Sequence, residues 1–370
     1  KYVFLFVLFG ALLDKAGAGN YFIKTAFAYL GHFSGGPGKA AVVSSALTGL
    51  VSGSSIANVV TTGTFTIPMM KRVGLSAEKA GAIEVASSVN GQIMPPVMGA
   101  AAFLMIEYVN MPYSQLITHA FLPALISYIA LVYIVHLEAQ KMGLKGLERV
   151  EPASPILVTL LKIVSYILVV VTLAIVVYYG LGWIKDVMPD FAFLIVCILL
   201  AAVYLKLIRR VAQFPELEMD DPNAPVAKLP YRKPTVNAGL HFLLPVVVLM
   251  WCLMVEQFSP GLSAFWGTVA LAVILITQRP LLSFFRKNGE NKTALFKQGV
   301  QELVDGLESG SRNMIGIGIA TATAGIIVGA VSLTGFGVQL SSIIEMLSMG
   351  NILLMLILVA IFSLILGMGL

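Results

Sequence analysis

The chain has 370 residues, of which 58% are hydrophobic and only 12% are charged, and its mean hydropathy is +0.90. Soluble domains carry about a quarter of their residues as charged side chains, so this composition excludes an ordinary water-soluble enzyme. The net charge of +5 fits a membrane protein whose surplus Lys and Arg lie in cytoplasmic loops, and it does not indicate nucleic-acid binding.

The two ends of the chain lie in apolar sequence. The chain begins at Lys1 directly before one apolar run and stops at Leu370 inside another, so we expect it to be an internal piece of a longer protein. Cys197 and Cys252 both lie in apolar runs, and the four His form no metal-binding motif. The sequence therefore predicts neither a disulfide framework nor a transition-metal centre.

The first 138 residues are predicted to form one structural repeat. A partial membrane span over residues 2–13 comes first, and Gly17 and Gly19 then open an amphipathic helix that runs to residue 30. A re-entrant hairpin over residues 40–70, a broken helix over 77–109 and a span over 114–138 complete this repeat.

The hairpin is predicted from two apolar arms that are too short to cross a membrane. Each arm has about a dozen apolar residues, whereas a full span needs about 20. Their junction at residues 52–55 reads Ser-Gly-Ser-Ser, which favours a turn over a helix. Because Lys39 and Lys71 flank the two arms, both outer ends are expected in the cytoplasm and the polar tip near the membrane midplane.

The helix over residues 77–109 is predicted to unwind at its centre. Pro95 and Pro96 remove two backbone N–H donors, and the Asn90-Gly91 pair permits positive φ. Unwound backbone at membrane depth is tolerated where it lines a cavity, its carbonyls suit a hard cation, and half-helix N-termini suit an anion. The tip and this break together indicate a site for a cation and a carboxylate. The structural alternative is that the small residues serve helix packing and the prolines only a kink.

Two carboxylates lie on the arms of the broken helix. Glu107 is near the outer end, which indicates an interfacial position. Glu84, about two turns before the break, is either a proton carrier or the partner of Lys79 or another basic residue, and the ion pair is the interpretation that we favour.

Further spans are predicted along the rest of the chain, over residues 157–180, 189–208, 238–257, 262–279 and 313–333, with a partial one over 350–370. More than half of the 24 Lys and Arg residues lie in the linkers 139–155, 206–234 and 279–298, whereas the linkers 181–188 and 258–261 hold only Lys185. The positive-inside rule therefore places the three basic linkers in the cytoplasm.

The part of the chain after residue 138 is predicted to consist of four segments. Residues 139–210 are predicted to hold linking transmembrane helices, residues 211–236 a proline-rich cytoplasmic linker, and residues 237–292 a helix pair with a cytoplasmic loop. Residues 293–370 are predicted to begin a second repeat, which is truncated in its hairpin. Its first part, residues 293–311, is amphipathic and lies either at the cytoplasmic membrane interface or docked on the protein itself.

The second repeat resembles the first in reversed orientation. Residues 335–348 repeat the Gly-x-Gly start and amphipathic helix of residues 17–30. Each copy leads into an apolar arm, which reaches Ser52-Gly53-Ser54 in the first and Gly367-Met368-Gly369 in the second. The predicted fold class is an all-α polytopic membrane protein with an ion-transporter-type inverted repeat, re-entrant helical hairpins and broken transmembrane helices.

Two motifs carry a resemblance to a known family. SGSSIANVVTTGTFTIPMMKRVG (residues 52–74) and NGQIMPPVMGAAAF (residues 90–103) resemble the large membrane subunit of the TRAP transporters (tripartite ATP-independent periplasmic transporters). The match is strongest to the fused permease of the TAXI branch, and residues 321–337 and 364–370 also fit.

The resemblance implies a bacterial or archaeal inner-membrane importer of organic acids, coupled to an ion gradient, usually Na⁺, and moving by an elevator motion. Its implied partners are an extracytoplasmic solute-binding protein of the TAXI type and small-subunit-like helices expected before Lys1.

The resemblance also implies specific site residues. Its ion-binding positions correspond to Ser52, Gly53, Ser54, Asn58, Asn90, Gly91 and Pro95, and its substrate-binding positions to Ser55, Thr62, Gln92 and Pro96. No cofactor is expected beyond Na⁺ as the coupling ion, with H⁺ as the alternative. A second ion site is expected beyond Leu370.

Other classes of membrane protein fit the sequence less well. A channel would need a continuous polar pore, and an intramembrane enzyme would need a nucleophile and base, or a metal cluster, at one depth. No such grouping and no nucleotide-binding Walker motif occurs in the sequence, so we expect neither an enzyme nor a primary pump.

Overall fold

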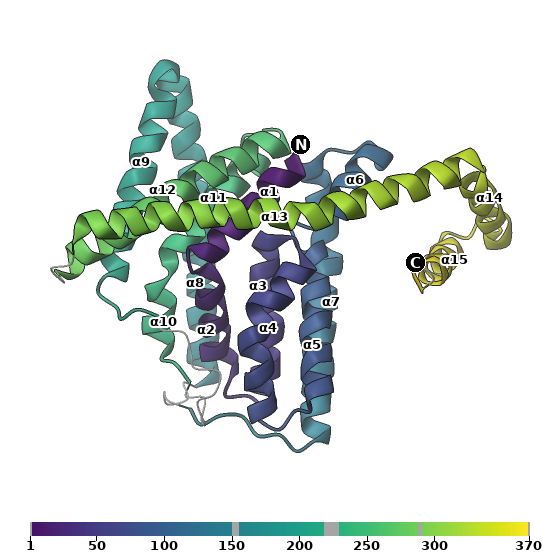
Figure 1. Ribbon diagram of the computed structural model, residues 1–370, viewed down its shortest axis with the longest axis horizontal. Helices are drawn as coiled ribbons and strands as arrows, with labels where there is room; N and C mark the ends of the chain where they lie inside the picture. The colour runs from purple at the N-terminus through teal and green to yellow at the C-terminus, as the bar shows by residue number, and fades with distance from the viewer. Residues whose placement is uncertain (1, 150–154, 218–228, 288–290, 369–370) are drawn as a thin grey trace. The chain divides into compact units, whose positions relative to one another are not determined.

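The computed structural model describes the chain except for residues 1, 150–154, 218–228, 288–290 and 369–370 (Figure 1). Every regular element that it describes is a helix. The chain divides into two units, residues 1–313 and 314–370, which are described separately.

The first unit contains most of the helices. In chain order they are α1 (Tyr2–Lys15), α2 (Ala18–Leu30), α3 (Gly36–Ser52), α4 (Ser55–Arg72), α5 (Ala77–Asn90), the short turn η1 (Gly91–Ile93), α6 (Ala100–Val109), α7 (Tyr113–Lys141), α8 (Ile156–Val187), α9 (Pro189–Val211), α10 (Arg232–Ala238), η2 (Leu240–Phe242), α11 (Leu243–Met250), the π-helical turn η3 (Trp251–Val255) and α12 (Pro260–Arg286). Helix α13 (Lys292–Leu333) begins in the first unit and ends in the second, which also holds α14 (Phe336–Ser348) and α15 (Ile352–Met368).

Among the described residues, four single helices are long and apolar enough to cross a membrane, namely α7, α9, α12 and α13. The pair α1–α2, bent by 67°, and the segment from α10 to η3, bent by 44°, are candidates for one broken span each. The chain is therefore a polytopic, all-helical membrane protein, as the sequence predicts.

A bend marks the start of one predicted span. The predicted span 238–257 corresponds to the helical segment Leu240–Val255, and α10 ends at Ala238, directly before it. The reason for the bend is the tight contact between Gly239 and α2, since a Cβ on Gly239 would lie 2.2 Å from Cδ2 of Tyr21. The chain bends here, where it passes the ring of Tyr21.

Four helices of the first unit, α3, α4, α5 and α7, pack side by side (Figure 1). Their shared core includes Val42 of α3, Met70 of α4, Ala80 of α5 and Tyr128 of α7, all of them buried. This four-helix group contains the two interruptions that the sequence predicts near residues 53 and 91, so both lie within one packed body.

A second core packs against this group and supports the broken helix. Phe6 of α1 lies against Phe103 of α6 and Tyr113 of α7, with ring centroids 5.2 and 5.9 Å apart, respectively. The rings of Phe103 and Tyr113 are stacked. Helix α1 also packs along α12, so this core ties the early and late helices of the unit together.

The amphipathic stretch 293–311 continues without a break into the predicted span at 313, as the single helix α13. Its glycines make the close contacts within the first unit: a Cβ on Gly299 would lie 2.8 Å from the carbonyl oxygen of Leu275, and one on Gly310 would lie 2.8 Å from Cδ1 of Leu8. The apolar side chains of Phe296 and Val304 remain about half exposed. The stretch is therefore docked on the protein through its glycines and through Leu303, which packs against the core, while Phe296 and Val304 of its apolar face remain exposed.

The two stretches proposed to repeat share their local geometry. Helices α2 and α14 each have 13 residues, and each follows a glycine with positive φ, Gly17 at 103° and Gly335 at 66°. Their inverted arrangement stays a prediction, and Gly369 of the predicted second tip lies outside the described residues.

Candidate functional site

The tip of the hairpin is a sharp two-residue turn. Helix α3 ends at Ser52, Gly53 adopts φ 57°, and Ser54 caps α4 by accepting a hydrogen bond from the backbone N–H of Ala57 at 3.3 Å. Glycine is needed at this turn for two reasons. Its φ lies in the left-handed region, and a Cβ there would lie 2.1 Å from the carbonyl oxygen of Met98.

The broken helix unwinds where the sequence predicts. Helix α5 ends at Asn90, η1 follows over Gly91–Ile93, and irregular backbone with a cis bond between Pro95 and Pro96 leads to α6. Two of the unwound carbonyl groups, those of Pro96 and Val97, accept hydrogen bonds from the hydroxyl of Tyr113 at 2.7 and 3.0 Å. Tyr113, which stacks on Phe103, thus holds the backbone of the break at Pro96 and Val97 in place.

The tip and the break lie directly against each other. The side-chain amide of Gln92 donates a hydrogen bond to the hydroxyl of Ser55 at 2.7 Å, and the backbone N–H of Gly99 donates to the carbonyl of Gln92 at 2.6 Å. One turn before the tip, Gly49 touches Gly91, since a Cβ on Gly49 would lie 2.7 Å from the Cα of Gly91. Two interrupted segments from different parts of the chain therefore form one site.

The predicted ion-binding residues surround this junction. The hydroxyl of Ser52 is buried and has no hydrogen-bond partner among the described residues. Asn58 is buried one turn after the tip and donates from its amide to the carbonyl and hydroxyl of Ser45 at 3.1 and 2.9 Å. Gly91 and Pro95 are buried and Asn90 is partly exposed. The hydroxyl of Ser52 is therefore available as an oxygen ligand for a cation.

The predicted substrate-binding residues divide into two pairs. Gln92 is exposed and Ser55 partly exposed, and their side chains meet at the surface of the junction. Thr62 and Pro96 are buried instead. The Thr62 hydroxyl lies 2.8 Å from the carbonyl oxygen of Asn58 and is also hydrogen-bonded to the carboxyl group of Glu84, whereas the Pro96 carbonyl accepts from Tyr113. Only Ser55 and Gln92 of this set present polar atoms at the surface.

Glu84 does not pair with Lys79, contrary to the interpretation favoured from the sequence. Lys79 forms an ion pair with Glu138 of α7, and Glu84 accepts hydrogen bonds from Thr62 and Thr66. The reason is helix rotation, because Lys79 and Glu84 lie five residues apart and project from different faces of α5.

The sequence analysis did not identify several residues that hydrogen-bond to the site residues or to their neighbours. These are Ser45, Thr66, Ser88 and Tyr128 around Asn58 and Glu84, and Tyr113 at the break. A signal for some of them was present. Asn58, Thr62 and Thr66 recur every fourth residue, as do Glu84 and Ser88, which places polar stripes on facing sides of α4 and α5.

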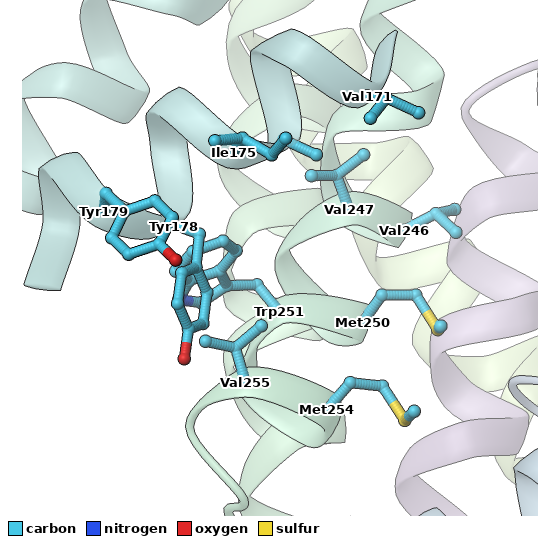
Figure 2. Close-up of a pocket in the computed structure, with 11 residues that line it drawn as sticks. Val171, Ile175, Tyr178, Tyr179, Val246, Val247, Met250, Trp251, Met254 and Val255 are labelled. Atoms are coloured by element: carbon cyan, nitrogen blue, oxygen red, sulfur yellow. The ribbon is translucent and has the colours of Figure 1, made fainter. Parts of the chain in front are cut away.

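A separate groove lies between α8 and the α11–η3 segment (Figure 2). It has a volume of about 650 Å³ and is lined by residues that include Val171, Ile175, Met250 and Met254, with Tyr178 beside Trp251 (Figure 2). Its lining is almost entirely apolar, and an organic anion would find no charged partner there. This groove suits lipid contact and is distinct from the junction of the tip and the break.

Comparisons with known proteins match the whole chain to one family. The model of the family described as "Tripartite ATP-independent periplasmic transporter, DctM component" matches residues 2–186 and 187–370.

The chain is also similar to individual permeases. It is 36% identical over 91 residues to the C4-dicarboxylate TRAP transporter large permease protein DctM of Rhodobacter capsulatus, which covers 25% of this chain and 21% of that protein. It is 28% identical over 138 residues to the sialic acid TRAP transporter permease protein SiaT of Haemophilus influenzae, covering 37% of this chain and 22% of that protein. An uncharacterized protein of Sinorhizobium fredii is 27% identical over 138 residues, covering 37% of this chain and 32% of that protein. The similar regions thus span a third or less of the length of these relatives.

Proposed function

Because the chain belongs to the family of the DctM component of the tripartite ATP-independent periplasmic transporters, we propose that it imports an organic acid across the inner membrane. The substrate would be delivered by an extracytoplasmic solute-binding protein, of the TAXI type, and transport would be driven by a Na⁺ gradient. The two named relatives are a C4-dicarboxylate permease and a sialic acid permease, which supports a carboxylate as the substrate class.

The observation that carries this proposal is the junction of the hairpin tip and the broken helix. It brings the start of α4, with Ser55, against the exposed side chain of Gln92. The positive end of a helix dipole and an amide donor together suit a carboxylate group. The groove beside α8 offers no comparable polar groups.

We place the Na⁺ site beside this carboxylate site, at Ser52, Gly53, Ser54, Asn58, Asn90, Gly91 and Pro95. The unpartnered hydroxyl of Ser52 supports this assignment. A cation next to the substrate carboxylate would couple the two binding events, because each charge lowers the cost of placing the other at membrane depth.

The transport motion that we propose is an elevator movement of the packed group α3, α4, α5 and η1. The contacts within this group support movement as one body, since Gly49 packs against Gly91 and the hydroxyl groups of Ser45 and Ser88 are hydrogen-bonded at 3.3 Å. One observation favours proton coupling as a second candidate, namely the buried carboxyl of Glu84.

The proposed function is tested by uptake into proteoliposomes that contain the full-length protein. Radiolabelled succinate, as a C4-dicarboxylate, and a sialic acid would be offered with the cognate binding protein under an inward Na⁺ gradient, an inward proton gradient, or neither. We expect saturable uptake of a carboxylate that needs both the binding protein and an ion gradient. Flux that is independent of the binding protein and does not saturate would contradict an importer and indicate a channel.

A cap substitution tests the cation site. We expect Ser54→Ala to raise the Na⁺ concentration needed for half-maximal uptake and to cost about 1 kcal/mol of stability through loss of the α4 cap. Ser76→Ala is the matched control, because Ser76 caps α5 with the same type of hydrogen bond, accepting from the N–H of Lys79 at 3.3 Å. Thermal unfolding in detergent should show similar losses for both variants. A wild-type Na⁺ dependence in Ser54→Ala would refute its place in the site.

A further inference from the structure

Glu84 lies in the middle of α5 and is completely enclosed. Its side chain is 0% exposed. One carboxyl oxygen is hydrogen-bonded to the hydroxyl of Thr62 and the other to that of Thr66, both on α4, and the hydroxyl of Ser88 lies 3.5 Å from the first of these oxygens. All three partners are neutral hydroxyl groups.

Basic side chains of the helices around α5 have other partners or lie at the helix ends. Lys39 of α3 is bonded to Nδ1 of His136 of α7 at 3.0 Å, and Lys79 is paired with Glu138. On α4, Lys71 and Arg72 lie in the last turn, five and six residues beyond Thr66. Among the described residues, no basic side chain is hydrogen-bonded or ion-paired with Glu84.

The phenol of Tyr128 on α7 is a further titratable group that faces Glu84. Its hydroxyl donates to the carbonyl of Ser87 at 2.9 Å, so it does not donate to the carboxyl itself. From α3, the neutral hydroxyl of Ser45 lies 3.3 Å from that of Ser88.

A carboxylate that is enclosed with neutral partners alone carries a large desolvation cost. In protein interiors and at membrane depth, such a group is neutralised by a bound cation or by a proton. The packing here favours the proton. The hydroxyl and carboxyl oxygens contact one another directly, and Gly63, between the two threonines on α4, packs against the side chain, since a Cβ there would lie 3.2 Å from Cγ of Glu84. Hard metal cations instead need several oxygens arranged around a gap.

We propose that Glu84 is a proton-binding site, separate from the Na⁺ site at the tip, and that it carries one proton inward in each transport cycle. The carboxylate takes the proton from water on the outer side and becomes a carboxylic acid, and it returns the proton to cytoplasmic water. The transport cycle in this proposal rests on the proposed function, whereas binding of the proton does not.

Hydrogen bonds connect Glu84 to the junction of the hairpin tip and the broken helix. Ser88 contacts both Glu84 and Ser45, and Ser45 accepts from the amide of Asn58. That amide nitrogen lies 3.2 Å from where a Cβ on Gly91 would be. A change at the tip that moves Asn58 is therefore transmitted to the groups that hold Glu84, which supplies the link between substrate binding and protonation.

Infrared difference spectroscopy on the purified full-length protein tests proton binding without any substrate. The carbonyl stretch of a protonated carboxylic acid is followed as the pH is raised, in choline chloride and in NaCl. We expect a band that shifts in D₂O, persists at neutral pH and disappears completely in Glu84→Gln. In Glu84→Asp, a carboxylic acid band should remain at a shifted position, which shows that loss of the band is not loss of folding.

Glu78→Gln is the matched control, because Glu78 is exposed in the first turn of the same helix. It should leave the band unchanged. The proposal is overturned if the band is absent at neutral pH, survives in Glu84→Gln, or is removed by NaCl but not by choline chloride, since the last result would make the site a Na⁺ site.

Uptake measurements then test the transport step. Glu84→Gln should lose the stimulation of succinate or sialic acid uptake by an inward proton gradient, whereas Glu78→Gln should keep it. Uptake in Glu84→Gln that still responds to the proton gradient would overturn the carrier role. If neither compound is taken up by the wild-type protein although the infrared band behaves as expected, the proposed function fails while proton binding at Glu84 stands.

Discussion

Replacing Gly53 by alanine is expected to lower ion-driven uptake by more than about tenfold. The residue has φ 57°, where an alanine costs about 1–2 kcal/mol, and the added Cβ would lie 2.1 Å from the carbonyl oxygen of Met98. Neither partner is a flexible side chain, because the clash is between the hairpin tip and the backbone of the break. The two segments must therefore separate, which disrupts the junction on which both the cation and the carboxylate depend.

The effect of the clash can be separated from that of backbone strain. Gly143, in the turn after α7, has a similar φ of 64°, and a Cβ there meets nothing within 4 Å. We expect Gly143→Ala to lose only about 1–2 kcal/mol in thermal unfolding and to retain uptake. Uptake by Gly53→Ala should fall more than about tenfold, the factor that corresponds to 1.4 kcal/mol. Equal behaviour of the two variants would show that contact between the tip and the break is not required.

The interruptions of α3–α4 and α5–α6 could be predicted because their causes are local. Gly53 between serines and the Pro95-Pro96 pair disfavour a continuous helix whatever surrounds them. The bend at Gly239, between α10 and the span that follows, could not be predicted, because the chain bends there past the ring of Tyr21, which is distant in sequence. A single glycine in an apolar run does not reveal such a contact.

The candidate site could be predicted in part for a similar reason. The sequence identifies the tip and the break, and the structure brings them together through Ser55 and Gln92. Which side of α4 faces α5 depends on helix rotation and packing, so the partners of Glu84 remained ambiguous. The sequence shows that Thr62 and Thr66 share one face of α4, but only the structure shows that this face contacts Glu84.

A second glycine substitution is expected to have a comparably large effect on uptake while acting inside a helix. Gly49 lies near the end of α3, where alanine would add about 1 kcal/mol of helix propensity. Its Cβ, however, would lie 2.7 Å from the Cα of Gly91 and 3.4 Å from the carbonyl carbon and oxygen of Gly91. Overpacking of this kind costs about 1–3 kcal/mol, so the expected net result is a destabilised protein with α3 pushed away from the break.

The control for this substitution is Gly81→Ala, because Gly81 lies within α5 and a Cβ there meets nothing within 4 Å. Gly81→Ala should gain about 1 kcal/mol in thermal unfolding and retain uptake, since it adds propensity without a contact. Gly49→Ala should unfold at a lower temperature than the wild-type protein and require more Na⁺ for whatever uptake remains. Both glycines have helical backbone conformation, but Gly49 faces Gly91 whereas Gly81 faces open space. A gain of stability with unchanged Na⁺ dependence in Gly49→Ala would thus show that the approach of α3 to the break does not shape the ion site.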